Sequence, residues 1–412
     1  MSHLMNTYGR QPVTFVKGEG VWLFDADGNQ YLDALAGVAV NGLGHAHPKL
    51  VAAISEQAAK LIHVSNIYHI AEQEALADRL AEISGMDKVF FCNSGCEANE
   101  ASIKLARLYG HNKGVENPEI IVMQRAFHGR TMATLSATGN RKSQAGFEPL
   151  VSGFIRVPYD DLEAVKAIAS RKNNVVAILV EPVQGEGGVH IPADMRAYLQ
   201  GLRKLCDDNG WLLMLDEVQS GIARTGTWFA FQHTGVTPDV MSLAKGLGSG
   251  VPIGACVAKG VAADTFAPGK HGSTFGGNPL AATAGLITLK TIEEEALREN
   301  ALKMGDVICN GLRAALNGLA GVVVIRNAGL MIGVELDRPC GDLVKMALSD
   351  KLLINVTAEK VVRLLPPLVI NEAEAKELVM RLAALIKQFL TAPMDINADT
   401  KHHVKDLEKA TW

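Results

Sequence analysis

Residues 211–218 read WLLMLDEV, an apolar run that ends in two carboxylates and a valine. A short apolar run without polar alternation is typical of a strand that is buried on both faces of a sheet. Further runs of this character occupy residues 88–93, 119–124, 175–182 and 240–244, and helical stretches separate several of them. Alternating buried strands and helices predict an α/β fold with a large, mainly parallel sheet.

The flanking regions predict a second, smaller α+β domain. Apolar and polar residues alternate on either side of Asp27-Gly28, which predicts an antiparallel ribbon. Apolar residues recur at helical spacing in three regions: residues 48–84, with a break near Ser65, residues of about 276–316, and residues of about 378–389. Each region is predicted to be helical. The expected division is an N-terminal segment that contributes to the small domain (1–66), a large domain (67–316), a C-terminal small domain (317–390) and a polar tail (391–412).

Composition excludes several classes of protein. The chain has 412 residues, of which 48% are hydrophobic and 20% charged, so a disordered or fibrous chain is excluded. Its formal charge of -4 provides no excess of positive charge for nucleic-acid phosphates or an anionic membrane. No apolar stretch approaches the roughly twenty residues that cross a bilayer. Six cysteines without a CxxC pair favour reduced thiols, and we expect a cytoplasmic enzyme.

Asp216 closes the strand of the opening run. The carboxyl ends of parallel strands are where ligands bind in open α/β sheets, so this carboxylate is placed to meet a cation. The same residue could instead cap the turn that follows the strand. Its neighbour Glu217 must point to the opposite face, so the two are not a paired acid and base.

Two more features indicate a ligand with a phosphate and a reactive carbon. Lys245 follows another apolar strand among small residues, and desolvation or nearby positive charge would make its amine nucleophilic. The turn Ser94-Gly95-Cys96 precedes an amphipathic helix, whose N-terminal N–H groups and dipole suit a phosphate. This turn could also be a simple helix cap.

Two further loops complete the pattern. Residues 125–131 (RAFHGRT) contain the aromatic Phe127, and residues 270–279 (KHGSTFGGNP) offer the hydroxyls of Ser273 and Thr274 before a helix. One cofactor would use all of these groups. It needs an acid for its ring nitrogen, a lysine for an imine, a helix N-terminus for its phosphate and an aromatic side chain that stacks on its ring. The sequence therefore predicts pyridoxal phosphate.

The chain resembles a known family from about Thr14 to Leu390. The stretches NSGCEANE, AFHGRT, EPVQGEGG, LDEVQSGIARTG and HGSTFGGNP, with the Lys245 segment, are similar to the class III aminotransferases of the fold-type I pyridoxal phosphate enzymes. Three more stretches, VAVNGLGHAHP, FHGRTMATLSATG and VVRLLPPLVI, resemble the members that act on N-acetylornithine. The resemblance implies a fold-type I large domain with a seven-stranded type of sheet and a small α+β domain.

The resemblance also implies how the cofactor is held. Lys245 would bind it covalently and move a proton, Asp216 would keep the ring nitrogen protonated, and Gln219 would bond the ring oxygen. The implied cofactor-binding residues are Ser94, Gly95, Cys96, Phe127, Asp216, Glu217, Val218, Gln219, Lys245 and Thr274. In this family Thr274 reaches the phosphate of the other subunit, which implies a homodimer with shared sites. Cys96 departs from the Thr or Ala that is commoner at its position.

For the substrates, the resemblance implies two arginines. Arg130 would bind the α-carboxylate of N-acetylornithine and Arg363 that of glutamate or 2-oxoglutarate, while Glu186 would pair with Arg363 and swing away when glutamate binds. Ser273 would lie beside the substrate. The implied reaction transfers the terminal amino group of N2-acetyl-L-ornithine to 2-oxoglutarate, a step of arginine biosynthesis.

Alternatives remain open at this point. A relative with the same chemistry could act on succinyldiaminopimelate, succinylornithine, ornithine or 4-aminobutyrate, and a racemase, aminomutase or decarboxylase could use the same scaffold. A dinucleotide oxidoreductase would need GxGxxG, and KGLGSG has the wrong glycine spacing. A binding protein would have no reason to keep Lys245. No metal site is expected, because His45 and His47 have no acidic or thiol partners at suitable spacing.

Overall fold

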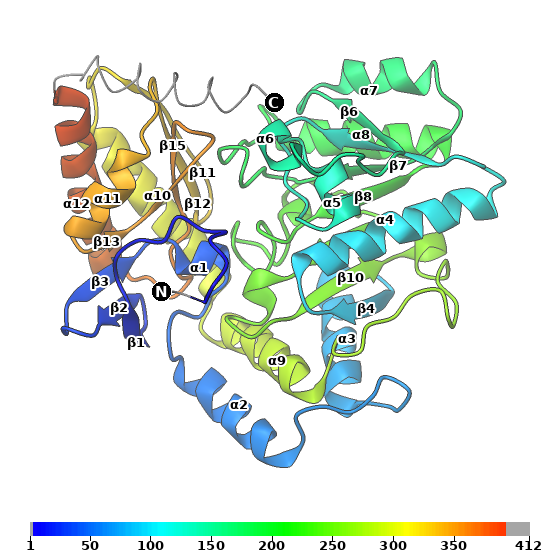
Figure 1. Ribbon diagram of the computed structural model, residues 1–412, viewed down its shortest axis with the longest axis horizontal. Coiled ribbons are helices and arrows are strands. Elements are labelled where there is room, and N and C mark those ends of the chain that lie inside the picture. Colours follow the sequence, from blue (N-terminus) through cyan, green and yellow to red (C-terminus); the bar gives the residue numbers. More distant parts are fainter. Residues whose placement is uncertain (1–2, 393–412) are drawn as a thin grey trace.

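The large sheet predicted from the apolar runs is present. In a computed structural model, which describes residues 3–392, seven strands pair in the order β4-β10-β9-β8-β7-β5-β6 (Figure 1). All pairings from β9 through β8, β7 and β5 to β6 are parallel, and β10 is antiparallel to both β9 and β4. The strands are β4 (Lys88–Cys92), β5 (Glu119–Met123), β6 (Phe154–Val157), β7 (Val175–Val180), β8 (Leu212–Asp216), β9 (Val240–Leu243) and β10 (Gly254–Ala258).

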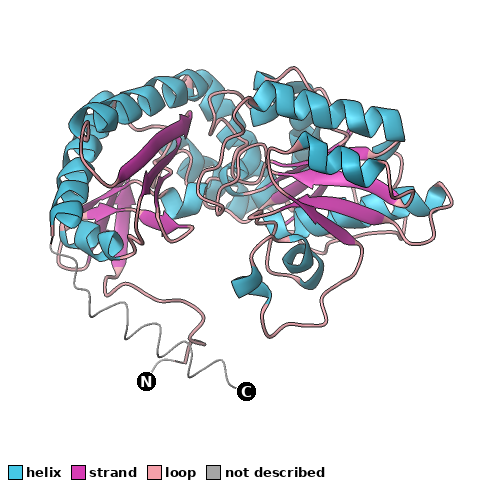
Figure 2. Cartoon of the chain, turned by 90° about the horizontal axis from the view of Figure 1, so that it is seen from above, coloured by secondary structure: helices cyan, strands magenta, loops and turns pink. Residues whose placement is uncertain are grey.

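The two faces of this sheet contact different helices, and that decides where the site residues point. Leu212 and Met214 of β8 join the core that contains α4 (Gly95–Asn112), whereas Leu213 and Leu215 join the core that contains α8 (Met195–Asn209). Because side chains alternate along a strand, Asp216 follows Met214 onto the α4 face. Figure 2 shows helices above and below the strands of the large sheet.

Two four-stranded sheets lie beside the large one (Figure 1). One has the order β1-β2-β3-β13 and the other the order β11-β12-β15-β14. The N-terminal ribbon is antiparallel, as predicted, and its third strand pairs in parallel with β13 from the C-terminal part of the chain. The strands are β1 (Phe15–Glu19), β2 (Trp22–Asp25), β3 (Gln30–Asp33), β11 (Val322–Ala328), β12 (Met331–Leu336), β13 (Leu352–Leu353), β14 (Asn355–Thr357) and β15 (Val361–Leu364).

The remaining helices cover these sheets. Among them, α2 and α3 are separated by a loop at residues 61–70, where the sequence predicts a break. The helices are α1 (Ala36–Ala39), α2 (Pro48–Lys60), α3 (Ala71–Ser84), α5 (Met132–Ala137), α6 (Arg141–Gln144), α7 (Leu162–Ala169), α9 (Pro279–Glu294), α10 (Leu297–Ala315), α11 (Asp342–Ser349) and α12 (Glu372–Thr391), with short 3-10 turns at η1 (Ala230–His233), η2 (Lys245–Leu247) and η3 (Gly260–Ala262).

Some elements differ from the sequence prediction. The single helical stretch predicted at about 276–316 is divided into two helices, α9 and α10. The division occurs because Ala296, between them, adopts a left-handed backbone (φ +50°). The sequence analysis did not predict strands β6 and β10. Strand β6 is only four residues long and contains an arginine, and strand β10 consists mainly of small residues. The predicted polar tail lies outside the described residues apart from 391 and 392, and the predicted domain boundaries stay predictions.

Within residues 3–392, no helix is long and apolar enough to cross a membrane.

Candidate active site

A cavity of about 350 Å³ lies at the carboxyl edge of the large sheet. It forms where β4, β8 and β9 end, so side chains that follow these strands converge on it. Nearly all the residues predicted to hold the cofactor line its wall: Ser94, Gly95, Cys96, Phe127, Asp216, Val218, Gln219 and Lys245. Glu186, predicted to act on the substrate, lines it as well.

The turn before α4 forms one end of the cavity. Ser94 is the N-cap of α4, and its Oγ accepts a hydrogen bond from the N–H of Glu97 at 3.2 Å. The N–H groups ahead of Glu97, those of Gly95 and Cys96, precede the first residue that can bond back within the helix, so they suit an anion. A Cβ at Gly95 would lie 2.7 Å from Cγ1 of Val218, so only glycine fits this turn. The sequence left a cap and a phosphate turn as alternatives, and the geometry suits both roles.

Cys96 has a contact that the sequence did not suggest. Its Sγ accepts a hydrogen bond from the backbone N–H of Arg130 at 3.1 Å. The intervening Gly129 has φ +143°, and a Cβ there would lie 2.4 Å from the same sulfur. Cys96 therefore links the turn before α4 to the loop that carries Phe127 and Arg130.

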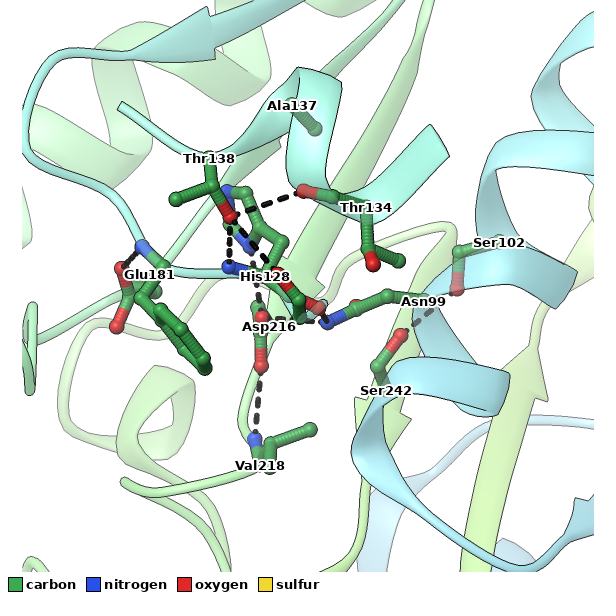
Figure 3. A network of polar contacts seen from close by, with 12 residues as sticks. Asn99, Ser102, His128, Thr134, Ala137, Thr138, Glu181, Asp216, Val218 and Ser242 are labelled. Atoms are coloured by element: carbon green, nitrogen blue, oxygen red, sulfur yellow. Dashed lines mark hydrogen bonds and ion pairs between the residues drawn. The ribbon is translucent and has the colours of Figure 1, made fainter. Parts of the chain in front are cut away.

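Asp216 is buried, with 4% exposure, in the network of polar contacts shown in Figure 3. Its Oδ2 accepts hydrogen bonds from Asn99 Nδ2 and from His128 Nδ1, both at 2.7 Å, and its Oδ1 accepts one from the N–H of Val218 at 3.0 Å. Charge-assisted bonds of this length hold a buried carboxylate in one orientation. Oδ1 keeps a free lone pair, and Asp216 lines the cavity.

Glu181 is a cavity residue that the sequence analysis did not single out. Its Oε1 accepts the N–H of Phe127 at 2.9 Å and its Oε2 the N–H of Gly185 at 3.0 Å, so it joins two loops of the cavity wall. Burial raises the pKa of Glu181 to about 7, with the charge of Asp216 adding to the rise and His128 opposing it. Like Asp216 it directly follows a parallel strand, and that position was the available signal.

Lys245 begins the turn η2 directly after β9, with its backbone in the left-handed region (φ +48°). A lysine in this conformation is strained, and such strain persists where the surrounding structure enforces it. Burial and the positive charge of Arg363 lower the pKa of Lys245. The carboxylates of Glu186, Asp216 and Glu181 raise it, and the net pKa is about 8. The uncharged fraction of such an amine near neutral pH is far larger than that of a lysine with the usual pKa of 10.5.

Arg363 on β15 is 1% exposed and is held by three side chains. Its Nη1 lies 2.9 Å from Glu186 Oε1 and 3.3 Å from Gln219 Oε1, while its Nε and Nη2 donate to Asn355 Oδ1 at 3.0 and 2.7 Å. The Glu186 side chain is 39% exposed. The structure thus brings together the predicted pair, and it adds Asn355, which no sequence motif marked.

A second cavity of about 870 Å³ adjoins the first, and Phe127 and Glu186 line both. Arg130 lines this outer cavity, with its guanidinium carbon 5.5 Å from the centre of the Phe127 ring. Arg125 and Arg141 also line it. The outer cavity is therefore the end of the site that suits carboxylates.

Four predicted residues do not line either cavity: Arg363, described above, and Glu217, Ser273 and Thr274. Glu217 faces the other way, as strand alternation requires: it is buried and accepts hydrogen bonds from Ser220 Oγ and from the N–H groups at positions 230 and 231. Its side chain therefore does not face the cavity, and a contact of Glu217 with the cofactor stays a prediction. Ser273 adjoins the inner cavity, since its Oγ accepts from Asn93 Nδ2 at 3.3 Å. Thr274 is exposed and lines neither of these two cavities.

The donor set of the inner cavity fits pyridoxal phosphate. The turn at Gly95 offers the N–H groups of a helix N-terminus for a phosphate, and Asp216 offers a fixed carboxylate for a ring nitrogen. Lys245 offers an amine of lowered pKa, and Phe127 lines the wall as an aromatic face. Within residues 3–392 no group of three or more His, Cys, Asp or Glu side chains is placed to hold a metal ion.

Comparisons with known proteins agree with this site. The model of the aminotransferase class-III family matches residues 5–386. An acetylornithine aminotransferase from Nitrosomonas europaea is 63% identical over 95% of this chain and 99% of its own. Among solved structures, an ornithine aminotransferase from Toxoplasma gondii superposes with a TM-score of 0.89 at 34% identity, covering 93% of this chain and 92% of that one. An acetylornithine aminotransferase from Elizabethkingia anophelis gives 0.85 at 35%, covering 94% and 96%.

The matched region contains every residue of the two cavities, and the neighbouring structures share the large mainly parallel sheet with a smaller α+β part. This chain belongs to the class-III aminotransferase family.

Proposed function

We propose that this chain transfers the terminal amino group of N2-acetyl-L-ornithine to 2-oxoglutarate, giving N-acetyl-L-glutamate 5-semialdehyde and L-glutamate in arginine biosynthesis. The observation that carries the proposal is the buried Arg363 with a half-exposed, displaceable counter-ion, Glu186, next to a cavity that contains Arg130. The acetylornithine aminotransferases at 57 to 63% identity support the choice of substrate.

Pyridoxal phosphate, the cofactor of class-III aminotransferases, supplies an electron sink for the negative charge that develops on the substrate carbon. The side chains of this protein do the rest. Lys245 would remove the proton from that carbon and return it, because its lowered pKa of about 8 lets the amine gain and lose a proton near neutral pH. Asp216 would pair with the ring nitrogen, and Phe127 and Val218, which line the cavity, would pack against the ring. The first-turn N–H groups at Gly95 and Cys96 would hold the phosphate.

The two arginines explain how one site serves two substrates in turn. Arg130 binds the distant carboxylate of N-acetylornithine as a planar, bidentate donor. Glu186 neutralises Arg363 meanwhile, so the inner cavity does not attract a second carboxylate. When glutamate binds, its α-carboxylate replaces Glu186 on Arg363. The exposed side of Glu186 gives its carboxylate access to water, which lowers the cost of leaving the pair.

We also propose a homodimer with shared active sites in the cytoplasm. Thr274 is exposed beside Ser273, which adjoins the cavity, and the neighbouring Phe275 is 60% exposed. The loop between α2 and α3 places Ile67 and Tyr68 in solvent at 80% and 63% exposure. A second subunit would cover such an apolar surface and would receive the Thr274 hydroxyl at its phosphate site.

A panel of amines tests the substrate assignment. We expect kcat/KM with 2-oxoglutarate as acceptor to be highest for N-acetylornithine, and lower by about tenfold or more for ornithine, 4-aminobutyrate and succinyldiaminopimelate, because the ratio reports differential binding in the transition state. A higher value for any other amine would assign the site to that amine. Activity with none of them would contradict the proposal.

Replacement of Arg130 should separate the two half-reactions. In Arg130→Ala we expect the single-turnover rate constant with N-acetylornithine, at subsaturating substrate, to fall by about ten- to a hundredfold, because a charge-assisted contact to the carboxylate is lost. The half-reaction with glutamate should fall much less. Arg363→Ala is the matched variant and should show the opposite selectivity. Equal losses in both half-reactions would contradict the two-arginine scheme.

The pKa of Lys245 predicts how the cofactor-free enzyme captures pyridoxal phosphate. Because only the uncharged amine attacks the aldehyde, the capture rate should rise with pH through a midpoint near 8, well below the usual lysine value of 10.5. Arg363→Ala removes a positive charge that lowers this pKa, so its midpoint should move to higher pH. Arg171→Ala, at an exposed position, is the control and should keep the wild-type profile. The same midpoint in Arg363→Ala as in the wild type would refute this electrostatic coupling.

A further inference from the structure

Arg224 is a buried arginine that the proposed reaction does not use. It is 2% exposed, and no carboxylate of residues 3–392 forms an ion pair with it. Burial lowers the pKa of Arg224 to about 9, so its guanidinium stays charged near neutral pH. Its Nη1 donates to two backbone carbonyls, that of Leu330 at 3.2 Å and that of Pro366 at 2.5 Å. Because a buried charge is costly without such partners, these two bonds hold the guanidinium in place.

Both carbonyls lie at the end of a strand in the sheet that carries Arg363. Pro366 comes three residues after Arg363, just beyond β15, and Leu330 comes directly before β12. In the pairing of β12 with β15, Arg363 is opposite Gly333, so the two strands share its position (Figure 1). The N–H of Leu330 also donates to the carbonyl of Arg224 at 3.0 Å. Arg224 is thus bonded, through its side chain and its backbone, to the strands that place Arg363.

The loop of residues 217–224 connects Arg224 to the inner cavity. Gln219 lines that cavity, and its Oε1 accepts a hydrogen bond from Arg363 Nη1 at 3.3 Å. Ile222, farther along the loop, has a left-handed backbone (φ +51°), which is strained for a β-branched residue and persists where the surrounding contacts enforce it. The loop therefore meets the Arg363 segment at two places, with Gln219 at the guanidinium and Arg224 at the backbone.

The other substrate arginine is supported independently. Arg130 lies in the loop after β5, and its N–H donates to Cys96 Sγ in the turn before α4. None of the hydrogen bonds of Arg224 reaches this loop or this turn. A change at Arg224 should therefore affect Arg363 and leave Arg130 in place.

We propose that Arg224 is a positioning residue for the substrate that binds Arg363. Its guanidinium holds the chain beyond β15 and the turn before β12 against the loop of residues 217–224, and so fixes where the Arg363 guanidinium lies relative to the cofactor. Arg224 lines neither cavity and touches no substrate. The inference rests on the proposed role of Arg363, which the experiment tests separately.

The experiment measures the dissociation constants of the enzyme loaded with pyridoxal phosphate for two unreactive ligands. Glutarate has the two carboxylates of 2-oxoglutarate, and its binding should depend on Arg363. N-acetylnorvaline has the carboxylate and the acetyl group of N-acetylornithine without the terminal amine, and its binding should depend on Arg130. Neither ligand has a free amino group or a keto group that could react, so the constants report binding alone.

The variants separate positioning from stability. Arg224→Met removes the charge and the donors at similar length, and Arg224→Gln is a second loss variant if Arg224→Met unfolds. Arg224→Lys keeps a charged donor, and because a single nitrogen makes both bonds to the carbonyls, an ammonium can replace it. Arg203→Met is the matched control: this arginine of α8 is 20% exposed and bonded to Asp239 at 2.7 Å. Thermal unfolding is measured for every variant.

We expect Arg224→Met and Arg224→Gln to lose about tenfold in affinity for glutarate, as when a charge-assisted contact is no longer aligned, and less than about twofold for N-acetylnorvaline. Arg224→Lys should recover most of the affinity for glutarate. Arg203→Met should lower the unfolding temperature and keep the wild-type affinity for both ligands.

Three results would overturn the inference: equal losses for both ligands in Arg224→Met and Arg224→Gln, no loss for glutarate, or a loss in Arg224→Lys as large as in Arg224→Met. Arg363→Ala tests the proposed function by itself and should bind glutarate about tenfold more weakly or worse. If Arg363→Ala binds glutarate as tightly as the wild type, the proposed role of Arg363 fails instead.

Discussion

The buried carboxylate of Asp216 is the constraint on which the rest of the site depends. A negative charge with 4% exposure needs donors around it, since burial of an unpaired charge costs several kcal/mol. Helix α4 supplies Asn99, the loop after β5 supplies His128, and the chain after β8 supplies the N–H of Val218. The same three segments carry the phosphate turn, the aromatic Phe127 and the floor of the cavity. The contacts that satisfy Asp216 therefore also assemble the site.

Burial divides the carboxylates of the site between fixed and exchangeable roles. Asp216 is enclosed and multiply bonded, so it keeps one orientation throughout the reaction. Glu186 faces the buried Arg363 with one side and water with the other, which suits the proposed exchange with an incoming carboxylate. Arg363 itself stays in place, because Asn355 and Gln219 hold its other donors. The difference between a permanent and a displaceable ion pair is thus set by the exposure of the acid.

Much of this site could be predicted from the sequence, because its residues follow apolar strands whose ends must converge. Asp216, Lys245 and the turn at Ser94 were found in this way, and alternation along β8 showed that Glu217 faces away. Its assignment as a cofactor contact came from the motif alone and stays a prediction, while its side chain accepts hydrogen bonds on the other face of the strand. Asn355 could not be predicted, since it comes from a three-residue strand and meets Arg363 only through the pairing of β14 with β15. The antiparallel β10 was missed because small residues give a weak strand signal.

An aminotransferase of this family takes an amino group from one substrate onto the cofactor and passes it to the next at a single site. The most direct measurement of the first half adds L-glutamate alone to the enzyme loaded with pyridoxal phosphate, with no keto acid present. We expect the visible absorbance of the bound cofactor to disappear while 2-oxoglutarate is released in an amount equal to the active sites. An unchanged spectrum with no 2-oxoglutarate would contradict it.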